Sequence, residues 1–442
     1  MLPILRKYQQ ASQKKDRIGM KQQIEDLLML PQRALIRTGF GRARIKRIVN
    51  QLDRANGKEV AIDQEAPEEV DKPNPDPVEA KVRRAAALVA QGNISRAARS
   101  LMQKEPMPWN EASRDRLKAL HPTGSDPNTF PRPPPQTAIP ILVIDPDWTR
   151  KIIRKAASGA SPGPSGWTEE LLLPITQTRE GLHLMGALLR DICNGVVEGD
   201  AREMLTAAKL IEIQNGDKTR PITMQETFVK IAALYALKLV EDKFPKIFEP
   251  IQFGIGTKGG PEKAAHVIQG HLEMGGSDAV NIKTDFTNAF NSVERKEVFR
   301  TLYNTPGLET MYKMCGWAYG APTWSMVVVN GEVKYSLEST QGVKQGDPLA
   351  AFLFALTVHP GYEKIVRNMA GVRAVAVLDD LNLVGKARQA LEAFEEIQPA
   401  VRHMSLSLKT QKCSLLWAHS VDPPEWLVQK CRQLRLKIVR GA

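Results

Sequence analysis

Residues 374–385 read AVAVLDDLNLVG, and this stretch decides the fold. Two short apolar runs flank the adjacent carboxylates Asp379 and Asp380, a pattern that predicts a β-hairpin with both aspartates at its turn. Such a turn lifts the carboxylates out of the sheet at one point, which suits a divalent metal ion. Taken alone, an Asp-Asp pair is more often a solvated turn, so a partner is needed from elsewhere in the chain.

A second strand with a carboxylate at its end lies upstream. Residues 280–292 read VNIKTDFTNAFNS, which predicts a short strand that ends at Asp285 and turns into a helix. A lone aspartate in this place often only caps the next helix. Two strands that both end in aspartate are a rarer set. They suit a pair of Mg²⁺ ions in phosphoryl transfer, which needs carboxylates that converge from separate elements.

A glycine-rich turn lies between these two strands in the sequence. Residues 341–349 read QGVKQGDPL and lead into an apolar helical run, residues 350–358. Glycine lets the backbone approach a substrate closely, and Pro348 suits a first helical turn. The turn alone also fits an ordinary capped helix start.

With four further stretches, the chain resembles the reverse transcriptases of non-LTR retrotransposons. Seven stretches follow the family's order: SPGPSG (161–166), RPI (220–222), QFG with GGPE (252–254 and 259–262), motif A (Asp285 and 288–292), motif B (341–349 and 353–356), motif C (377–380) and motif D (406–413). The resemblance covers roughly residues 155–416. It implies an α/β (α+β) right-hand polymerase fold of fingers and palm, and RNA-directed DNA synthesis by two-metal nucleotidyl transfer.

The resemblance also assigns roles to single residues. It implies two Mg²⁺ ions, with Mn²⁺ as an alternative, bound by Asp285 and Asp379, with support from Asp380 and the backbone carbonyl of Phe286. Lys412 becomes the proton donor to the leaving pyrophosphate. The implied substrate contacts are Phe290 beneath the incoming sugar, Gln345 and Gly346 in the nucleotide pocket, and Arg220 on the triphosphate. The implied partners are an RNA template, a DNA primer and deoxynucleoside triphosphates.

Four departures from the family leave an alternative open. Val377 stands where motif C usually has an aromatic residue, and Ser165 stands where the Pro-Gly-Pro turn usually has Asp. Gln214 or Asn215 replaces a triphosphate-binding Lys, for which Lys218 could substitute only if its loop folds back. Motif E and a thumb do not follow in residues 421–442, so we expect weak activity from this chain alone and a separate thumb-bearing chain as a partner. The alternative is a non-catalytic nucleic-acid-binding or structural protein derived from a reverse transcriptase.

Charge is unevenly distributed along the chain. Residues 1–60 hold 14 Lys and Arg against 5 Asp and Glu, whereas the other 382 residues hold 47 against 44. This asymmetry predicts a basic helical arm that binds a polyanion through Arg42, Arg44, Lys46 and Arg47. A solvated basic helix is the other interpretation.

Composition sets the remaining boundaries. We expect the arm over 1–60, a linker over 61–79, a small helical module over 80–122, a Pro-rich linker over 123–146, and fingers and palm over 147–420. The chain has no apolar run of about 18 residues, so no membrane span is predicted. Four scattered cysteines indicate an intracellular protein, for which we favour the nucleus over the cytoplasm, and the basic, Gln-rich start leaves a mitochondrial destination open.

Overall fold

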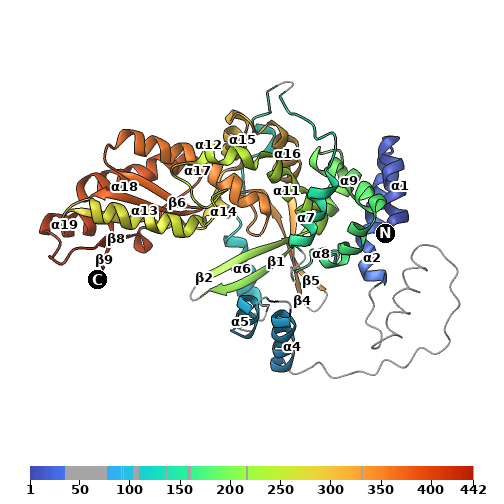
Figure 1. Cartoon of the computed structure of the whole chain (residues 1–442), viewed down its shortest axis with the longest axis horizontal. Helices are drawn as coiled ribbons and strands as arrows, with labels where there is room; N and C mark the ends of the chain where they lie inside the picture. Colours follow the sequence, from blue (N-terminus) through green and yellow to red (C-terminus); the bar gives the residue numbers. More distant parts are fainter. Residues whose placement is uncertain are drawn as a thin grey trace. The chain divides into compact units, whose positions relative to one another are not determined.

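The computed structural model describes residues 1–34, 77–90, 92, 94–102, 109–134, 137–156, 161–215, 218–329 and 332–441 (Figure 1). The chain divides into two compact units. The larger comprises Met1–Gln32, Glu111–Ile211 and Arg220–Ala442, and the smaller comprises Arg33–Asn110 and Glu212–Thr219.

The first helix and the second helix as far as Gln32 belong to the larger unit. They are α1 (Leu2–Gln13) and α2 (Arg17–Ala34). Tyr8 of α1 is buried and donates a hydrogen bond to Asp191 of α9 (Arg179–Cys193) at 3.0 Å, and Trp167 Nε1 donates to the Leu27 carbonyl of α2 at 2.7 Å. Residues 1–32 are therefore packed into the larger unit, and the expected separate arm over 1–60 does not describe them.

The expected helical module over 80–122 is divided between the units. Helices α4 (Pro77–Ala90) and α5 (Ile94–Met102) lie in the smaller unit, and α6 (Glu111–Ala119) lies in the larger. The expected Pro-rich linker is bound to the larger unit where it is described, since Ile141 exchanges two hydrogen bonds with the side chain of Asn194, at 2.9 and 2.7 Å.

One sheet has four strands in the order β2-β1-β4-β5. The strands are β1 (Ala208–Asn215), β2 (Lys218–Gln225), β4 (Thr323–Val329) and β5 (Glu332–Ser339). β1 and β4 are parallel, with Ala208 opposite Ser325, and β4 and β5 are antiparallel. The helices around this part of the chain are α7 (Pro146–Ala156), α8 (Glu169–Leu172), α9, α10 (Gly199–Thr206), α11 (Thr227–Val240) and α12 (Phe244–Phe248).

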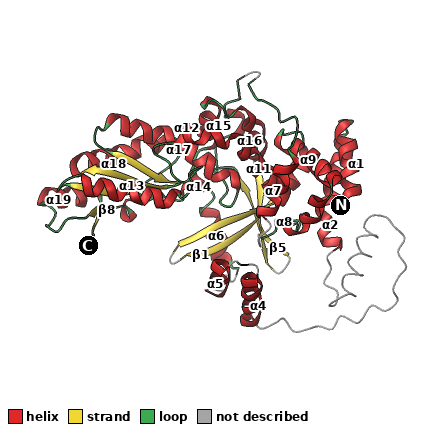
Figure 2. Cartoon of the chain, viewed as in Figure 1, coloured by secondary structure: helices red, strands yellow, loops and turns green. Residues whose placement is uncertain are grey.

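The second sheet has five strands in the order β6-β7-β3-β8-β9 (Figure 2). They are β3 (Ala279–Lys283), β6 (Arg373–Val377), β7 (Asp380–Lys386), β8 (Ser414–Trp417) and β9 (Lys437–Arg440). α17 (Pro348–Asn368) and α18 (Ala387–Val401) pack against each other and contact this sheet, and α13 (Gly260–Met274) contacts β3, β6 and β7. The apolar run after the glycine-rich turn is thus a helix, as predicted.

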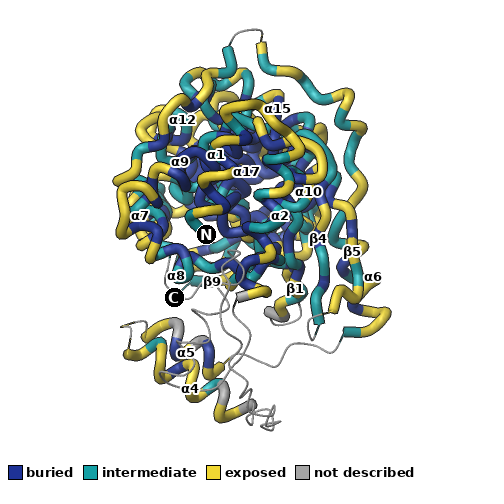
Figure 3. The backbone as a smooth tube through the Cα atoms, turned by 90° about the vertical axis from the view of Figure 1, so that its right-hand side faces the viewer, coloured by how far each residue is buried: buried dark blue, intermediate teal, exposed yellow. Residues whose placement is uncertain are grey.

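The core of the larger unit surrounds α17 (Figure 3). This helix buries residues on every side, which include Leu353, Phe354 and Tyr362. The remaining helices are α14 (Ala289–Ser292), α15 (Arg295–Asn304), α16 (Tyr312–Tyr319) and α19 (Glu425–Leu434). The short 3-10 turns are η1 (Pro127–Thr129), η2 (Leu173–Gln177), η3 (Glu241–Lys243), η4 (Glu309–Met311), η5 (Arg402–Met404) and η6 (Thr410–Lys412). None of the described helices is both long enough and apolar enough to span a bilayer.

Candidate active site

A hairpin forms at Asp379 as the sequence predicts, but only one of the two aspartates lies in its turn, since Asp380 begins β7. β6 and β7 are antiparallel and their last pair is Val377 opposite Asp380, so the turn consists of Leu378 and Asp379. Leu378 has a φ of 58°. That left-handed conformation costs a residue with a side chain about 1–2 kcal/mol. It persists only where the surrounding structure fixes it.

The side chain of Gln252 fixes this turn. Gln252 is buried, and its Oε1 accepts hydrogen bonds from the backbone N–H groups of Leu378 at 2.8 Å and Gly254 at 2.9 Å. Its Nε2 donates to the Leu378 carbonyl at 3.2 Å. One amide therefore satisfies both backbone groups of the left-handed residue. The resemblance to reverse transcriptases includes this segment, but it assigns no role to Gln252.

The neighbouring strand brings Asp285 to the same turn. β3 pairs antiparallel with β7. Just beyond β3, Thr284 donates to the Leu381 carbonyl from its backbone N–H at 2.9 Å and from Oγ1 at 3.1 Å. Asp285 follows Thr284 directly, and Asp380 precedes Leu381. Two strand ends that are far apart in the sequence thus meet, as expected.

Asp379 shows the electrostatic effect of this meeting. Burial raises its pKa most, and the negative charges of Asp380 and Asp285 raise the pKa further. A hydrogen bond with its own backbone and the positive charge of Arg220 lower it. Asp285 and Arg220 therefore both lie within electrostatic reach of Asp379, although the three residues come from separate segments.

Asp380 takes a different position from its neighbour. It forms an ion pair with Lys283 at 3.4 Å, and both side chains are more than half exposed (59% and 54%). An exposed pair of this kind contributes roughly 0–1 kcal/mol. In the described part of the chain, no three His, Cys, Asp or Glu side chains form a group that could hold a metal ion. The two aspartates Asp285 and Asp379 still fit Mg²⁺, which proteins usually bind through one or two carboxylates together with substrate phosphates and water.

Motif D is bound to motif A through the backbone. The Lys409 N–H donates to the Asp285 carbonyl at 2.7 Å, the Thr287 N–H donates to the Ser407 carbonyl at 2.9 Å, and Phe286 pairs with Leu408. Lys412 lies in η6 of this segment with an exposed side chain.

Cys413 adds a contact that the sequence did not indicate. Its thiol accepts a hydrogen bond from the Asp285 N–H at 3.4 Å, and burial raises its pKa. Like Cys193, Cys315 and Cys431, it is a buried free thiol.

The predicted nucleotide-pocket residues are held by motif B. The Phe290 ring stacks on Phe354 of α17, with centroids 4.8 Å apart. The Gln345 carbonyl accepts from the Thr223 N–H of β2 at 2.7 Å. Gly346 has a φ of +107°, and a Cβ there would lie 2.3 Å from the Thr223 carbonyl oxygen. Only glycine fits this position, where the backbone lies close to β2 of the protein itself. Arg220 also lies on β2, where it is exposed.

Arg295 supports the motif B loop from inside the protein. It is buried and donates to the carbonyl oxygens of Gly342 at 2.9 Å and Ser339 at 3.0 Å. Burial lowers its pKa to about 10. No local pattern in the sequence signals that Arg295 is buried.

Lys344 and Asp347 complete this buried network. Lys344 Nζ donates to the Thr206 carbonyl at 3.2 Å, and burial lowers the pKa of Lys344 to about 7. Asp347 caps α17 by accepting from the Leu349 N–H at 2.9 Å, and it accepts a second hydrogen bond from the Tyr319 hydroxyl.

The departure at Ser165 has a structural reason. Glu226 is buried, and its carboxylate accepts from the Ser165 N–H at 2.7 Å and from the Ser165 hydroxyl at 2.6 Å. Burial raises the pKa of Glu226 to about 7. An aspartate at position 165 would place a second carboxylate beside Glu226, whereas serine supplies a donor.

Several predicted residues lie outside the described residues. These are Arg42, Arg44, Lys46 and Arg47, the proposed polyanion contacts. The side chains of Gln214, Asn215 and Lys218 are also not described.

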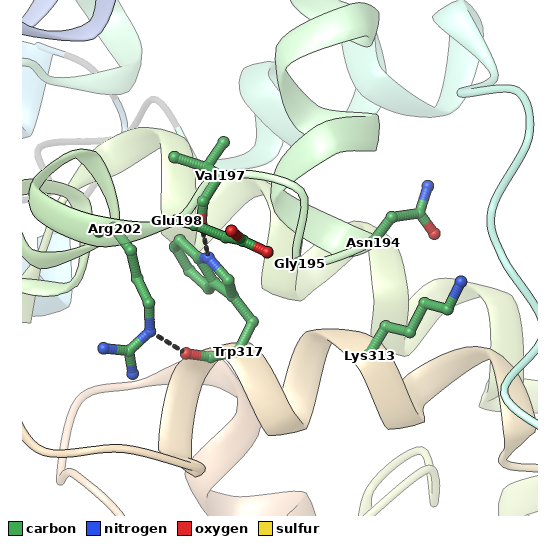
Figure 4. Close-up of a pocket in the computed structure, with 8 residues that line it drawn as sticks. Asn194, Gly195, Val197, Glu198, Arg202, Lys313 and Trp317 are labelled. Atoms are coloured by element: carbon green, nitrogen blue, oxygen red, sulfur yellow. Dashed lines mark hydrogen bonds between the residues drawn. The ribbon is translucent and has the colours of Figure 1, made fainter. Parts of the chain in front are cut away.

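A pocket of about 450 Å³ lies elsewhere on the larger unit, around Trp317 and Arg202 (Figure 4). Arg202 Nε donates to the Trp317 carbonyl at 2.8 Å, and Trp317 Nε1 donates to the Val197 carbonyl at 2.6 Å. None of the predicted site residues lines it. The Arg202 guanidinium donates its hydrogen bonds to backbone carbonyls, so it is already occupied within the protein.

The region that carries this geometry matches a known family. Residues 213–428 match the family described as reverse transcriptase (RNA-dependent DNA polymerase). These residues form a reverse transcriptase domain. The domain contains the Asp285 and Asp379 strands, the motif B loop and motif D, and its mixed helix and sheet content suits polymerase fingers and palm.

The chain is also similar to proteins of retrotransposable elements. The chain is 27% identical over 289 residues to the retrotransposable element SLACS 132 kDa protein of Trypanosoma brucei gambiense, which covers 65% of this chain and 24% of that protein. It is 26% identical over 139 residues to the retrovirus-related Pol polyprotein from type-1 retrotransposable element R2 of Nasonia vitripennis, which covers 30% of this chain and 14% of that protein. The chain thus spans a quarter or less of the length of these relatives. A solved structure of apo telomerase from Candida tropicalis has a TM-score of 0.37 and 12% identity, over 49% of this chain and 52% of that one.

Proposed function

We propose that the reverse transcriptase domain extends a DNA primer on an RNA template with deoxynucleoside triphosphates, by two-metal nucleotidyl transfer. The observation that carries the proposal is the meeting of Asp285 and Asp379 at one turn, with Arg220 within electrostatic reach. Phosphoryl transfer mainly requires positioning and charge neutralisation, and these groups supply both functions.

Each residue has a role in this proposal. Asp285 and Asp379 would hold two Mg²⁺ ions, for which Mn²⁺ can substitute, and the bound ions would supply activation of the primer hydroxyl and charge stabilisation for the leaving pyrophosphate. Arg220 contacts the triphosphate, since a planar guanidinium matches phosphate geometry. Lys412 protonates the pyrophosphate. Asp380 supports the site and is released from Lys283 when the metal ions bind.

The pocket residues select the nucleotide. Phe290 lies beneath the sugar and excludes a 2′-hydroxyl by its volume, and the fixed backbone of Gln345 and Gly346 lines the pocket. The metal ligands include the Phe286 carbonyl. We further propose that the basic segment with Arg42, Arg44, Lys46 and Arg47 holds nucleic-acid phosphates, and that the protein acts inside the cell, in the nucleus.

The test is primer extension by the full chain on a primed RNA template with Mg²⁺ or Mn²⁺. Asp379→Asn retains the shape of the side chain but removes a metal ligand, so we expect it to lower extension at least about 100-fold. Asp242→Asn is the matched control, because Asp242 is exposed and pairs only with the adjacent Lys243. Extension that survives Asp379→Asn would refute the proposed site. Template binding without any extension by the wild type would instead favour the non-catalytic nucleic-acid-binding alternative.

A further inference from the structure

The segment that follows α6 lies across the loop that carries Phe290. The carbonyl oxygen of Leu120 accepts a hydrogen bond from Asn288 Nδ2 at 2.8 Å and from Asn291 Nδ2 at 3.0 Å. A carbonyl oxygen has two lone pairs, so these two donors fill its capacity. Leu120, which is far from motif A in the sequence, therefore holds residues on both sides of Phe290.

Gly124 fastens the same segment to the start of motif B. Its N–H donates to Thr340 Oγ1 at 3.0 Å. A Cβ at Gly124 would lie 2.4 Å from the Thr340 carbonyl oxygen and 2.7 Å from Gln341 Oε1. Distances under 3.0 Å require something to move. The segment 120–124 is thus packed too closely against motif B to accept any side chain at position 124.

Phe290 is held from its other sides by motif B. Its carbonyl accepts from the Val343 N–H at 2.7 Å, and its ring stacks on Phe354. Asn288, at the start of the loop, has a φ of 48°. This conformation is accessible to Asn and Asp but is strained for most other residues. The two asparagine side chains therefore tie this loop to a segment that lies outside motif B.

The contact depends on amide chemistry. Only the amide form of Asn288 and Asn291 can donate to the Leu120 carbonyl, because an ionised aspartate accepts hydrogen bonds and cannot donate them. An Asn→Asp change keeps the size of the side chain and its tolerance of the left-handed backbone, yet it replaces attraction with repulsion between oxygens.

We propose that segment 120–124 is a specificity-determining element of the nucleotide pocket, which holds Phe290 in the position that rejects ribonucleotides through the hydrogen bonds from Asn288 and Asn291 to Leu120. This inference rests on the proposed function, in which Phe290 contacts the sugar. Leu120 and the two asparagines are positioning residues, since they act through Phe290.

The test compares the full-length wild type with Asn291→Asp and Gly124→Ala, which loosen the contact from opposite sides. The first readout is hydrogen exchange of the backbone amides over residues 286–292, which requires no catalysis. The second readout is the ratio of deoxyribonucleotide to ribonucleotide incorporation. Loss of one hydrogen bond at this site should raise exchange about tenfold and lower the selectivity ratio by a similar factor. Incorporation of deoxyribonucleotides should change less than incorporation of ribonucleotides.

Gly270→Ala is the matched control, because the nearest atom to a Cβ at Gly270 lies 3.9 Å away. Unchanged exchange over 286–292 in both variants would overturn the inference. Faster exchange with an unchanged selectivity ratio would also overturn it, because the contact would then be only structural. A wild type that shows no selectivity or no incorporation would count against the proposed function, and the exchange measurement would still decide whether Leu120 holds the loop.

Discussion

Replacing Gln252 by methionine should destabilise the larger unit and disable the Asp379 turn. Methionine has a similar size, but it supplies no donor or acceptor strong enough to replace the amide. The substitution removes three hydrogen bonds, two to Leu378 and one to Gly254. It leaves the backbone N–H and carbonyl of a half-buried left-handed residue without their partner, at roughly 1–3 kcal/mol for each group. Partial access of water lowers the sum, so we expect a loss of about 2–4 kcal/mol, which is a large fraction of the roughly 5–15 kcal/mol that stabilises a domain.

The assay is urea unfolding of the full chain, followed by both fluorescence and circular dichroism to establish whether the transition is two-state. Gln429→Met is the control, because Gln429 is exposed and bonds only to Glu425 one turn away. The control should stay within about 0.5 kcal/mol of wild type. If Gln252→Met also stays within that range, Gln252 does not hold the turn, and the reasoning is refuted.

Four further predictions concern the buried ionisable groups and the motif B glycine. Ser165→Asp should destabilise the protein by about 2–4 kcal/mol, because it replaces a donor to buried Glu226 with a second carboxylate; urea unfolding at pH 7 measures this, and a neutral result would contradict it. Burial raises the pKa of Glu226 to about 7, so the folded state binds this proton more tightly than the unfolded state does. The resulting contribution to the free energy of unfolding is complete below about pH 4.5 and is lost as the pH rises through 7. The free energy of unfolding of the wild type should therefore decline between pH 5 and 8, and this decline should be absent in Glu226→Gln. Burial lowers the pKa of Lys344 to about 7, and its contribution to stability has the opposite sign. That contribution is present above the ordinary pKa of lysine and is lost as the pH falls through 7. Lys344→Met should therefore flatten the rise in the free energy of unfolding between pH 7 and 10. Gly346→Ala should abolish nucleotide binding in a fluorescence titration, because its Cβ would meet the Thr223 carbonyl, and retained affinity would show that the backbone adapts.

The sequence predicted the elements whose signals are local. The two short apolar runs and the Asp-Asp pair between them predicted the β6–β7 hairpin, and the glycine-rich turn followed by an apolar run predicted α17. Asp285 was found in the same way, as a polar residue at the end of an apolar strand. These signals lie within about ten residues, so a strand or turn can be predicted without knowledge of its neighbours.

The contacts that position the site have no local signal. Gln252 and Leu378 are 126 residues apart, and Asn291 and Leu120 are 171 apart. In the sequence, Gln252 and Arg295 resemble the polar residues of any surface. Nothing indicated that Leu378 would be left-handed, since leucine rarely adopts that conformation. The packing of residues 1–32 into the larger unit was also missed, because net charge describes a surface and does not reveal which apolar residues, such as Leu5 and Ile24, are buried.

The pairing of motif D with motif A has a consequence for how this region tolerates change over evolutionary time. Residues 285–287 and 407–409 are joined by main-chain hydrogen bonds. Main-chain groups are the same in almost every amino acid, so the side chains of Thr287 and Ser407 can drift without displacing Asp285. Proline is the exception, because it lacks the N–H that Thr287 and Lys409 each donate. Related sequences should therefore have many different amino acids at residues 285–287 and 407–409 other than Asp285, but no proline at positions 287 and 409.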